Sequence, residues 1–326
     1  MLLVCFGTRP EYIKIKPLLK ELDGVIDYKL LFTGQHIDLL QNFNDIKQLK
    51  ILDGSNRLDS IVCSVLNNEE IFNGITSVLI QGDTTSAFGI ALAAFHRRIK
   101  IIHLEAGLRT YNKNHPYPEE FNRRSISAMA DIHLCPTQLT VDNLIQEGFK
   151  DGIYLVGNTV LDNLINIVPK YSNKVLVTLH RRENHDIMEE WFKVIDKIAN
   201  KYKDIEFILP IHPNPNVQKH KNLLKNVKVV KPMDYEQCID YLAQCKLVIT
   251  DSGGIQEESS FLKKKCIVCR EHTERSEGLN TFSTLVSPKT IENIFDKLII
   301  DYIIDIPSPY GDGKSSKKIV NILKAV

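Results

Sequence analysis

The sequence predicts an α/β protein made of two doubly wound parallel-sheet domains of Rossmann-like type. Twelve short apolar runs rich in Val, Ile and Leu alternate with longer helical stretches along the chain. The runs are apolar throughout, as expected of parallel strands that are buried on both faces. Because twelve strands are too many for one ordinary doubly wound sheet, and 326 residues suffice for two domains, we expect two sheets.

The expected strands divide evenly around a boundary between residues 158 and 171. Six lie before it and six after it: 2–6, 29–33, 77–81, 100–105, 132–136 and 153–157, then 174–179, 206–211, 227–231, 246–250, 265–269 and 283–287. Helices are expected between them, for example over 13–22, 86–95 and 189–202. The stretch 169–172 has the composition of a linker. Alternating strands and helices favour βαβ units in both halves.

Composition excludes several classes of protein. The 41 basic side chains balance 40 acidic ones, so neither nucleic acid nor an anionic membrane is an expected partner. No apolar run approaches the roughly 20 residues of a membrane-spanning helix. The first eleven residues run from a strand into a turn and do not resemble a signal peptide. We expect a cytoplasmic protein.

The seven cysteines agree with a reducing compartment, because most lie in apolar runs. Cys266 and Cys269 form a CxxC pair, but the pair lies within an expected strand, where this spacing puts the two thiols on opposite faces. The histidines are scattered without zinc-ligand spacing. No GxGxxG opens the first helix, so the usual dinucleotide fingerprint is missing. We expect no metal and no cofactor.

Polar side chains follow the strands of the N-terminal half, where ligands of open α/β sheets bind. Residues 7–11 (GTRPE) follow the first strand and precede Lys14, a pattern that suits an anion at a helix N-terminus or an ordinary solvated turn. Asp83 follows the third strand and either caps the next helix or has a chemical role. Glu105 ends the fourth strand, where a buried carboxylate is costly without a partner.

Glu119 and Arg123 stand four residues apart on an expected helix, the spacing of an ordinary surface ion pair. Glu119 nevertheless joins Asp83 and Glu105 at the same edge of the sheet. Repulsion among three carboxylates raises at least one of their pKa values, which is how acid/base sites are made.

The C-terminal half shows the same arrangement. His180 and His212 follow two of its strands. Ser252, Gly253 and Gly254 follow a third strand and open a helix, so bare backbone N–H groups are available to phosphate oxygens. Glu258 lies farther along that helix, in reach of ribose hydroxyls.

Together these motifs resemble the non-hydrolysing UDP-N-acetylglucosamine 2-epimerase family. The motifs occur in order along nearly the whole chain: GTRPE, QGDTT, HLEAGLRT, PEEFNRR, GNTVLDNL, LHRREN, IHPNPN, DSGGIQEE, TER and PYGDG. The resemblance implies a GT-B-like fold, with two Rossmann-like domains facing a cleft, and a homodimer. It implies an N-terminal acid/base domain (1–163), a C-terminal UDP-binding domain (164–312) and a terminal helix (313–326) that crosses back.

The resemblance also implies reversible C2 epimerisation of a UDP sugar, by loss of UDP to a 2-acetamidoglucal and re-addition, without a cofactor. Its implied catalytic residues are Asp83, Glu105, Glu119, Arg123 and His180, with the first proton acceptor left open. Its implied substrate-binding residues are Arg9, Lys14, Ser252, Gly253, Gly254, Glu258 and Arg275. Gln35, His36 and His212 fall in motifs that form an activator site for a second sugar nucleotide in some bacterial members.

Several positions depart from the family pattern. Cys238 stands where an aromatic side chain usually lies near the uracil, Ser276 replaces the proline of TERPE, and residues 279–282 replace a small turn. These departures leave open a modified sugar (3-acetamido, uronic or 6-deoxy) as substrate. Three further alternatives are a hydrolysing epimerase that releases N-acetylmannosamine, a GT-B glycosyltransferase and a non-catalytic binder.

Overall fold

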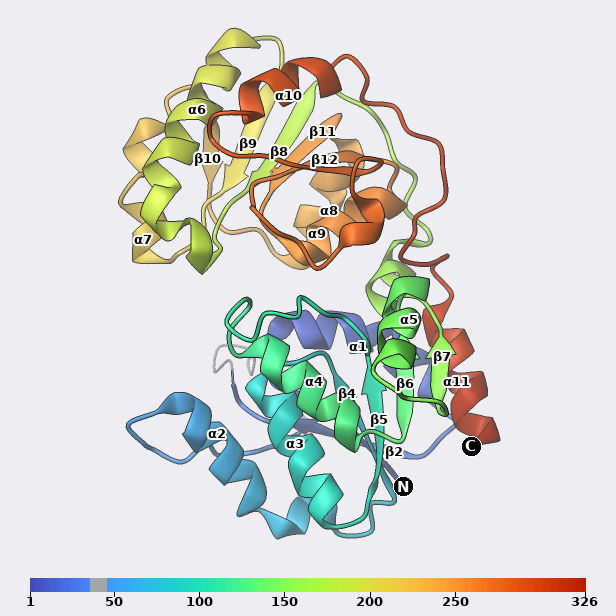
Figure 1. Ribbon diagram of the computed structural model, residues 1–326. Coiled ribbons are helices and arrows are strands. Elements are labelled where there is room, and N and C mark those ends of the chain that lie inside the picture. The colour runs from blue at the N-terminus through green and yellow to red at the C-terminus, as the bar shows by residue number, and fades with distance from the viewer. Residues whose placement is uncertain (36–45) are drawn as a thin grey trace. The chain divides into compact units, whose positions relative to one another are not determined.

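The computed structural model describes residues 1–35 and 46–326, which fold as two compact units (Figure 1). Unit 1 contains residues 1–163 and 311–326, and unit 2 contains residues 164–310. Unit 2 is therefore inserted into the sequence of unit 1, and the chain passes between the units twice. Each unit is built around one parallel sheet, so the predicted fold class is confirmed.

The sheet of unit 1 has the strand order β3-β2-β1-β4-β5-β6-β7, and all neighbouring strands are parallel. Its strands are β1 (Leu2–Phe6), β2 (Tyr28–Phe32), β3 (Lys47–Gln48), β4 (Ser77–Gln81), β5 (Lys100–Leu104), β6 (Ile132–Cys135) and β7 (Ile153–Leu155). The sequence predicts six of them. It misses β3, whose two exposed residues give no apolar run. The order reverses at β1, and such a reversal is where ligands bind in this class of sheet.

Helices cover both faces of this sheet. Helices α2, α3 and α4 pack on the face that carries Leu3 and Cys5, and α1 and α11 pack on the face that carries Leu2 and Val4. The helical elements of unit 1 are α1 (Arg9–Leu22), α2 (Arg57–Leu66), α3 (Thr85–His96), α4 (Glu119–Met129), α5 (Gln138–Gln146) and α11 (Ser315–Ala325), with the short 3₁₀ helices η2 (Glu69–Phe72) and η3 (Thr159–Leu164). The alternation of strand residues between two helix layers explains why the runs are apolar throughout.

Unit 2 repeats the architecture with the strand order β10-β9-β8-β11-β12-β13, again parallel. Its strands are β8 (Lys174–Thr178), β9 (Glu206–Pro210), β10 (Lys228–Val230), β11 (Leu247–Thr250), β12 (Lys265–Val268) and β13 (Ser283–Leu285). The order reverses between β8 and β11. All six strands were expected from the sequence.

The core of unit 2 centres on Trp191 and Phe192 of α6, which pack with α7 and α10 on the sheet face of Val175 and Val177. Helices α8 and α9 contact the central strands as well. The helical elements are α6 (Met188–Lys201), α7 (Pro215–Gln218), α8 (Tyr235–Gln244), α9 (Gly253–Phe261) and α10 (Ile291–Leu298), with the 3₁₀ helices η4 (Arg182–Ile187), η5 (Lys221–Leu223) and η6 (Ser276–Gly278).

The C-terminal helix α11 belongs to unit 1 by packing as well as by hydrogen bonding. Its first backbone N–H groups, on Ser315 and Ser316, donate to the carboxylate of Asp162 at 3.0 and 2.6 Å. Ile319 and Val320 are buried against α1. A carboxylate at a helix N-terminus satisfies unpaired donors and interacts favourably with the helix dipole.

None of the helices over residues 1–35 and 46–326 combines the length and apolarity that a membrane crossing requires.

Candidate active site

The turn between β1 and α1 is tied to the turn between β4 and α3 by one buried carboxylate. Thr8 caps α1, and Glu11 accepts hydrogen bonds from the backbone N–H groups of Gly7 and Thr8, both at 2.7 Å. Its other oxygen accepts from the Thr84 hydroxyl at 2.6 Å. Burial raises the pKa of Glu11, and these hydrogen bonds oppose the rise. The two turns that carry the GTRPE and QGDTT motifs are thereby fixed against each other.

Glu105 stands at the end of β5 in a polar cage. The Lys14 ammonium contacts both carboxylate oxygens at 2.6 Å, and side chains of Gln81 and Asn158 donate to one oxygen each. Glu105 is 8% exposed and has a φ of +67°, a backbone region that only glycine adopts without strain. The carboxylate at the carboxyl edge of the sheet is therefore carried by a strained backbone position.

Asp83 lies directly beyond β4 and pairs with Arg123 of α4. One Asp83 carboxylate oxygen accepts from Nε of Arg123 at 2.9 Å and also from Nη2. The carbonyl of the preceding Gly82 accepts from a ring nitrogen of the buried His103 at 2.8 Å. Asn122 donates to the Asp83 carbonyl at 2.9 Å. Asp83 is thus held from both its backbone and its side chain, and it does not serve as a helix cap, because Thr84 caps α3.

Glu119 is the first residue of α4 and is half-buried. The side chain of Arg123 reaches Asp83 and also Glu120, the neighbour of Glu119. The three expected carboxylates therefore come from the ends of β4 and β5 and from the start of α4. Two of them are paired with cations, Asp83 with Arg123 and Glu105 with Lys14.

The remaining residues expected in this half are placed differently. Arg9 is exposed at the start of α1. The side-chain oxygen of Gln35 accepts from the hydroxyl and the backbone N–H of Ser86, at 2.8 and 3.2 Å, at the N-terminal end of α3. His36 lies outside the described residues. Lys14, expected on a diphosphate, contacts Glu105 in this structure.

In unit 2, Asp251 organises the turn that carries His180. It is fully buried beyond β11, and its Oδ2 accepts from the backbone N–H groups of His180 and Arg181 and from the Asn184 side chain, at 2.8–3.0 Å. The His180 ring stacks on His212 at a centroid distance of 5.3 Å. Burial and the neighbouring His180 lower the pKa of His212. Two of the predicted histidines are therefore brought together.

Helix α9 begins without a side-chain cap, because Ser252 makes no capping hydrogen bond. A Cβ atom on Gly254 would meet nothing within 4 Å, whereas one on Gly253 would approach the Glu274 carboxylate at 3.0 Å. Glu258 is buried on the same helix. Burial raises the pKa of the Cys238 thiol to about 12, and the nearby Glu258 carboxylate contributes to the rise. The helix start therefore has open space at Gly254, a geometry that lets phosphate oxygens approach the backbone there.

Beside this helix start lies a buried group of alternating charges. Arg275 donates to Glu257 at 2.6 Å and to Glu274 at 3.0 Å, and Glu274 also accepts from Arg270 at 3.0 Å. Burial alone would raise the pKa of Glu274, but Arg275, Arg270 and Arg181 hold it well below its usual value. The Tyr310 hydroxyl donates to the Arg275 carbonyl at 2.9 Å. Arg275 is therefore held at both its backbone and its side chain.

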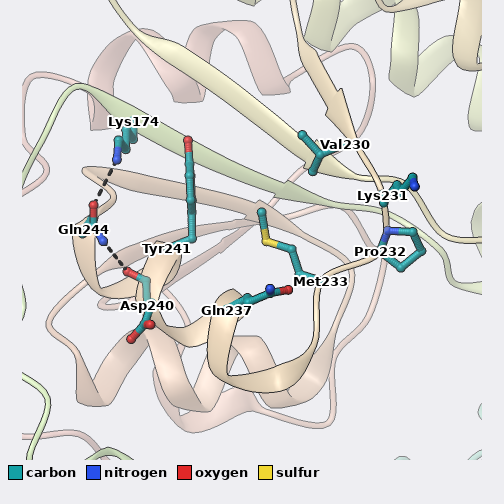
Figure 2. Close-up of a pocket in the computed structure, with 9 residues that line it drawn as sticks. All are labelled: Lys174, Val230, Lys231, Pro232, Met233, Gln237, Asp240, Tyr241 and Gln244. Atoms are coloured by element: carbon teal, nitrogen blue, oxygen red, sulfur yellow. Dashed lines mark hydrogen bonds between the residues drawn. The ribbon is translucent and has the colours of Figure 1, made fainter.

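A separate pocket of about 590 Å³ in unit 2 lies along α8 (Figure 2). Lys174 lies over the Tyr241 ring at 5.0 Å and donates to Gln244 at 3.0 Å, and the Tyr241 hydroxyl donates to Glu206 at 3.0 Å. None of the residues expected in a site lines this pocket.

Sequence reasoning missed the residues that hold the site together. They are Gln81, His103, Glu120 and Asn158 in unit 1 and Asp251 and Glu274 in unit 2. Asp251 could have been predicted from the sequence, because it is an aspartate directly after a buried strand, as Asp83 is. Gln81, His103 and Asn158 acquire their partners through tertiary packing, whereas Glu120 and Glu274 also pair with arginines three and four residues away in the sequence.

The fold defines a class of protein: an α/β protein of two units, each built around one doubly wound parallel sheet. A family model described as UDP-N-acetylglucosamine 2-epimerase matches residues 20–324. The chain belongs to this family.

Individual relatives agree over the whole chain. A UDP-N-acetylglucosamine 2-epimerase of Campylobacter jejuni is 38% identical, with 99% of this chain and 97% of the relative covered. One of Bacillus subtilis (strain 168) is 37% identical, with 98% and 93% covered. Among solved structures, UDP-GlcNAc 2-epimerase from Neisseria meningitidis bound to UDP-GlcNAc matches with a TM-score of 0.91, 33% identity and complete coverage of both chains.

Proposed function

We propose that this protein catalyses the reversible C2 epimerisation of UDP-N-acetylglucosamine and UDP-N-acetylmannosamine. The observation that carries the proposal is the carboxylate set of unit 1: Asp83 bound to Arg123, Glu105 bound to Lys14, and Glu119 at the start of α4. Family membership and the UDP-GlcNAc in the Neisseria structure support the choice of substrate. The assigned reaction is an isomerisation, and the protein an isomerase.

The proposed chemistry needs acid/base groups and no net oxidation. A base takes the proton from C2 while the bond between C1 and the UDP oxygen breaks, giving 2-acetamidoglucal and UDP. A proton is then delivered to the opposite face of C2 while UDP adds back to C1. Asp83, Glu105 and Glu119 form the acid/base set of the proposal, in which two of them serve the two faces of the sugar ring.

The diphosphate leaving group needs cations and backbone donors. We assign it to the open start of α9 at Ser252, Gly253 and Gly254, with His180 and Arg275. Exposed Arg9 supplies a further cation, and Glu258 the ribose contact. Because Lys14 contacts both oxygens of Glu105 at 2.6 Å, we assign it a second role, the control of charge on that carboxylate.

Three finer expectations belong to the same proposal. Gln35, His36 and His212 form the activator site for a second UDP sugar. The protein acts as a homodimer, which light scattering on the purified protein tests. It works in the cytoplasm, in agreement with its seven free cysteines, five of them buried.

Proton NMR of UDP-N-acetylglucosamine with the enzyme in D2O tests the reaction directly. We expect UDP-N-acetylmannosamine to appear with deuterium at C2. Free N-acetylmannosamine with UDP would replace the proposal by a hydrolysing reaction. UDP binding without exchange at C2, also in the presence of both sugar nucleotides, would contradict catalysis on this substrate and direct attention to a modified sugar.

Substitution separates the roles of the carboxylates. Glu105→Gln, Asp83→Asn and Glu119→Gln should each lower kcat by a factor of about 100 to 10,000, the range for a lost acid/base group. C2 exchange measured from each epimer separately identifies which group serves which face. Turnover of Glu105→Gln at the wild-type rate would contradict the site assignment.

A further inference from the structure

Glu120 is a buried carboxylate to which neither the sequence nor the proposed reaction assigns a role. It stands next to Glu119 in the first turn of α4 and is 0% exposed. A buried carboxylate is costly unless hydrogen bonds and an opposite charge satisfy it. Its position in the first turn of a helix is favourable, but that position explains only part of its burial.

Both oxygens of Glu120 hold the loop that follows β5. Oε2 accepts from the backbone N–H of Thr110, and Oε1 from that of Tyr111, each at 3.0 Å. Tyr111 has a φ of +58°, so the loop adopts a conformation that its sequence alone does not favour. This loop leaves the sheet five residues after Glu105, and Glu120 therefore ties the exit from β5 to the start of α4.

The same carboxylate also contacts the arginine that holds Asp83. Oε2 of Glu120 accepts from Nη1 of Arg123 at 3.3 Å, while Nε and Nη2 of that arginine face Asp83. Arg123 is 4% exposed, so its guanidinium orientation depends on these partners rather than on water. One edge of the guanidinium is used by Glu120 and the other by Asp83.

We propose that Glu120 is a positioning residue that orients Arg123, and through it Asp83, for proton transfer. The inference rests on the proposed function and deepens it. It differs from the expected role of Glu119, which acts on the substrate itself. Small displacements of catalytic groups cost up to two orders of magnitude in rate, so the orientation of Asp83 matters for kcat more than for binding.

The central test is Glu120→Gln. Glutamine keeps the size of the side chain, but it removes the charge facing Arg123 and offers one acceptor oxygen where glutamate offers two. We expect kcat to fall about 100-fold, while the KM for the UDP sugar stays within about threefold, since no assigned nucleotide contact is lost. If the measured kcat falls only in proportion to the amount of folded protein, so that the folded enzyme is fully active, the proposal is overturned.

A matched control is Glu147→Gln. Glu147 pairs with the buried Arg109 at 2.7 Å in the same unit, and neither side chain hydrogen-bonds to Asp83 or Glu120 among the described residues. This variant should lower the thermal midpoint and leave kcat within about twofold. If Glu147→Gln reduces kcat as much as Glu120→Gln does, the effect is general destabilisation and the proposal fails.

A double-mutant cycle tests the route through Arg123. If Glu120 acts through this arginine, Glu120→Gln should cost less than about threefold in kcat when Arg123→Gln is already present. Full additivity would contradict the proposal. Glu120→Asp, which keeps the charge on a shorter side chain, provides the same comparison if the glutamine variant does not fold, with an expected loss in kcat of at least about tenfold.

Amide hydrogen exchange separates this proposal from the proposed function. The N–H groups of Thr110 and Tyr111 should exchange faster in Glu120→Gln than in wild type, whatever substrate the protein uses. Faster exchange together with wild-type turnover would refute the positioning role alone. A wild-type protein that does not exchange the C2 proton would refute the proposed function, and unchanged amide exchange would refute the assigned contacts.

Discussion

The ion pair between Lys14 and Glu105 joins helix α1 to the end of β5. Their side chains are 14% and 6% exposed, so little solvent screens the pair. Breaking a buried pair by removing one partner leaves an uncompensated charge, which is more costly than never having had the pair. Loss of either partner alone should therefore destabilise unit 1.

Replacement of the lysine alone should destabilise unit 1 strongly. We expect Lys14→Met to lower the free energy of unfolding by about 3 kcal/mol at pH 7, because Glu105 keeps only its hydrogen bonds from Gln81 and Asn158. Urea denaturation measures the change. The double variant with Glu105→Gln should recover more than half of this loss. Equal losses in the single and double variants would show that the charge is not the cause.

At the scale of elements, two buried histidines face each other across the neighbouring strands β5 and β6. His103 and His133 are register partners, and each has a ring nitrogen without a hydrogen-bond partner among the described residues. Burial lowers the pKa of His103 to about 3 and of His133 to about 4, and the nearby Arg109 adds to both shifts. Both rings therefore stay neutral in the folded protein.

This pair makes stability depend on pH. In the unfolded chain both histidines bind a proton below about pH 6.5. In the folded protein His133 binds a proton only below about pH 4, and His103 only below about pH 3. Stability is therefore lost as the pH falls from 6.5, by about 1.4 kcal/mol per pH unit for each histidine. His103→Gln keeps a donor for the Gly82 carbonyl and should remove one histidine's share of the slope between pH 6.5 and 5. An unchanged slope in urea titrations would exclude His103 as its source.

At the start of α9, one substitution should change helix stability and UDP binding in opposite directions. Gly254 has open space around its Cα, so Gly254→Ala should stabilise the helix by up to about 1 kcal/mol. The new methyl group should nevertheless weaken UDP binding about tenfold, because phosphate oxygens then cannot approach the backbone. Calorimetric titration with UDP and a thermal melt measure the two effects. If Gly254→Ala binds UDP with wild-type affinity, the diphosphate does not bind at this helix start.

At the scale of the molecule, the apolar runs predicted both sheets because the central strands, such as β1, β4, β8 and β11, are almost entirely buried. The two-residue β3 is exposed and could not be found in this way. Asp83 and Glu105 were predictable because each directly follows a strand. Gln81 and Asn158 were not, since Glu105 lies 24 and 53 residues away from them and only packing brings them together. Glu120 has one local partner, Arg123, but the loop that it holds lies 9 and 10 residues away. The contact of Lys14 with Glu105 was missed for the same reason.

The insertion of unit 2 makes the folding of unit 1 depend on the last residues of the chain. Helix α11 buries Ile319 and Val320 against α1, and Asp162 holds its first turn. Strands and helices of unit 2, by contrast, come from one continuous segment. Ile319→Ala should therefore destabilise unit 1 by about 2–4 kcal/mol through the cavity it leaves.

Scanning calorimetry of this variant distinguishes the two units. UDP, which the proposal assigns mainly to unit 2, should raise the melting temperature of one transition, and Ile319→Ala should lower that of the other. Val217→Ala, in the core of unit 2, is the matched control and should lower the UDP-sensitive transition instead. If Ile319→Ala and Val217→Ala lower the same transition equally, the two units unfold as one cooperative body, and α11 then stabilises the whole molecule rather than unit 1 alone.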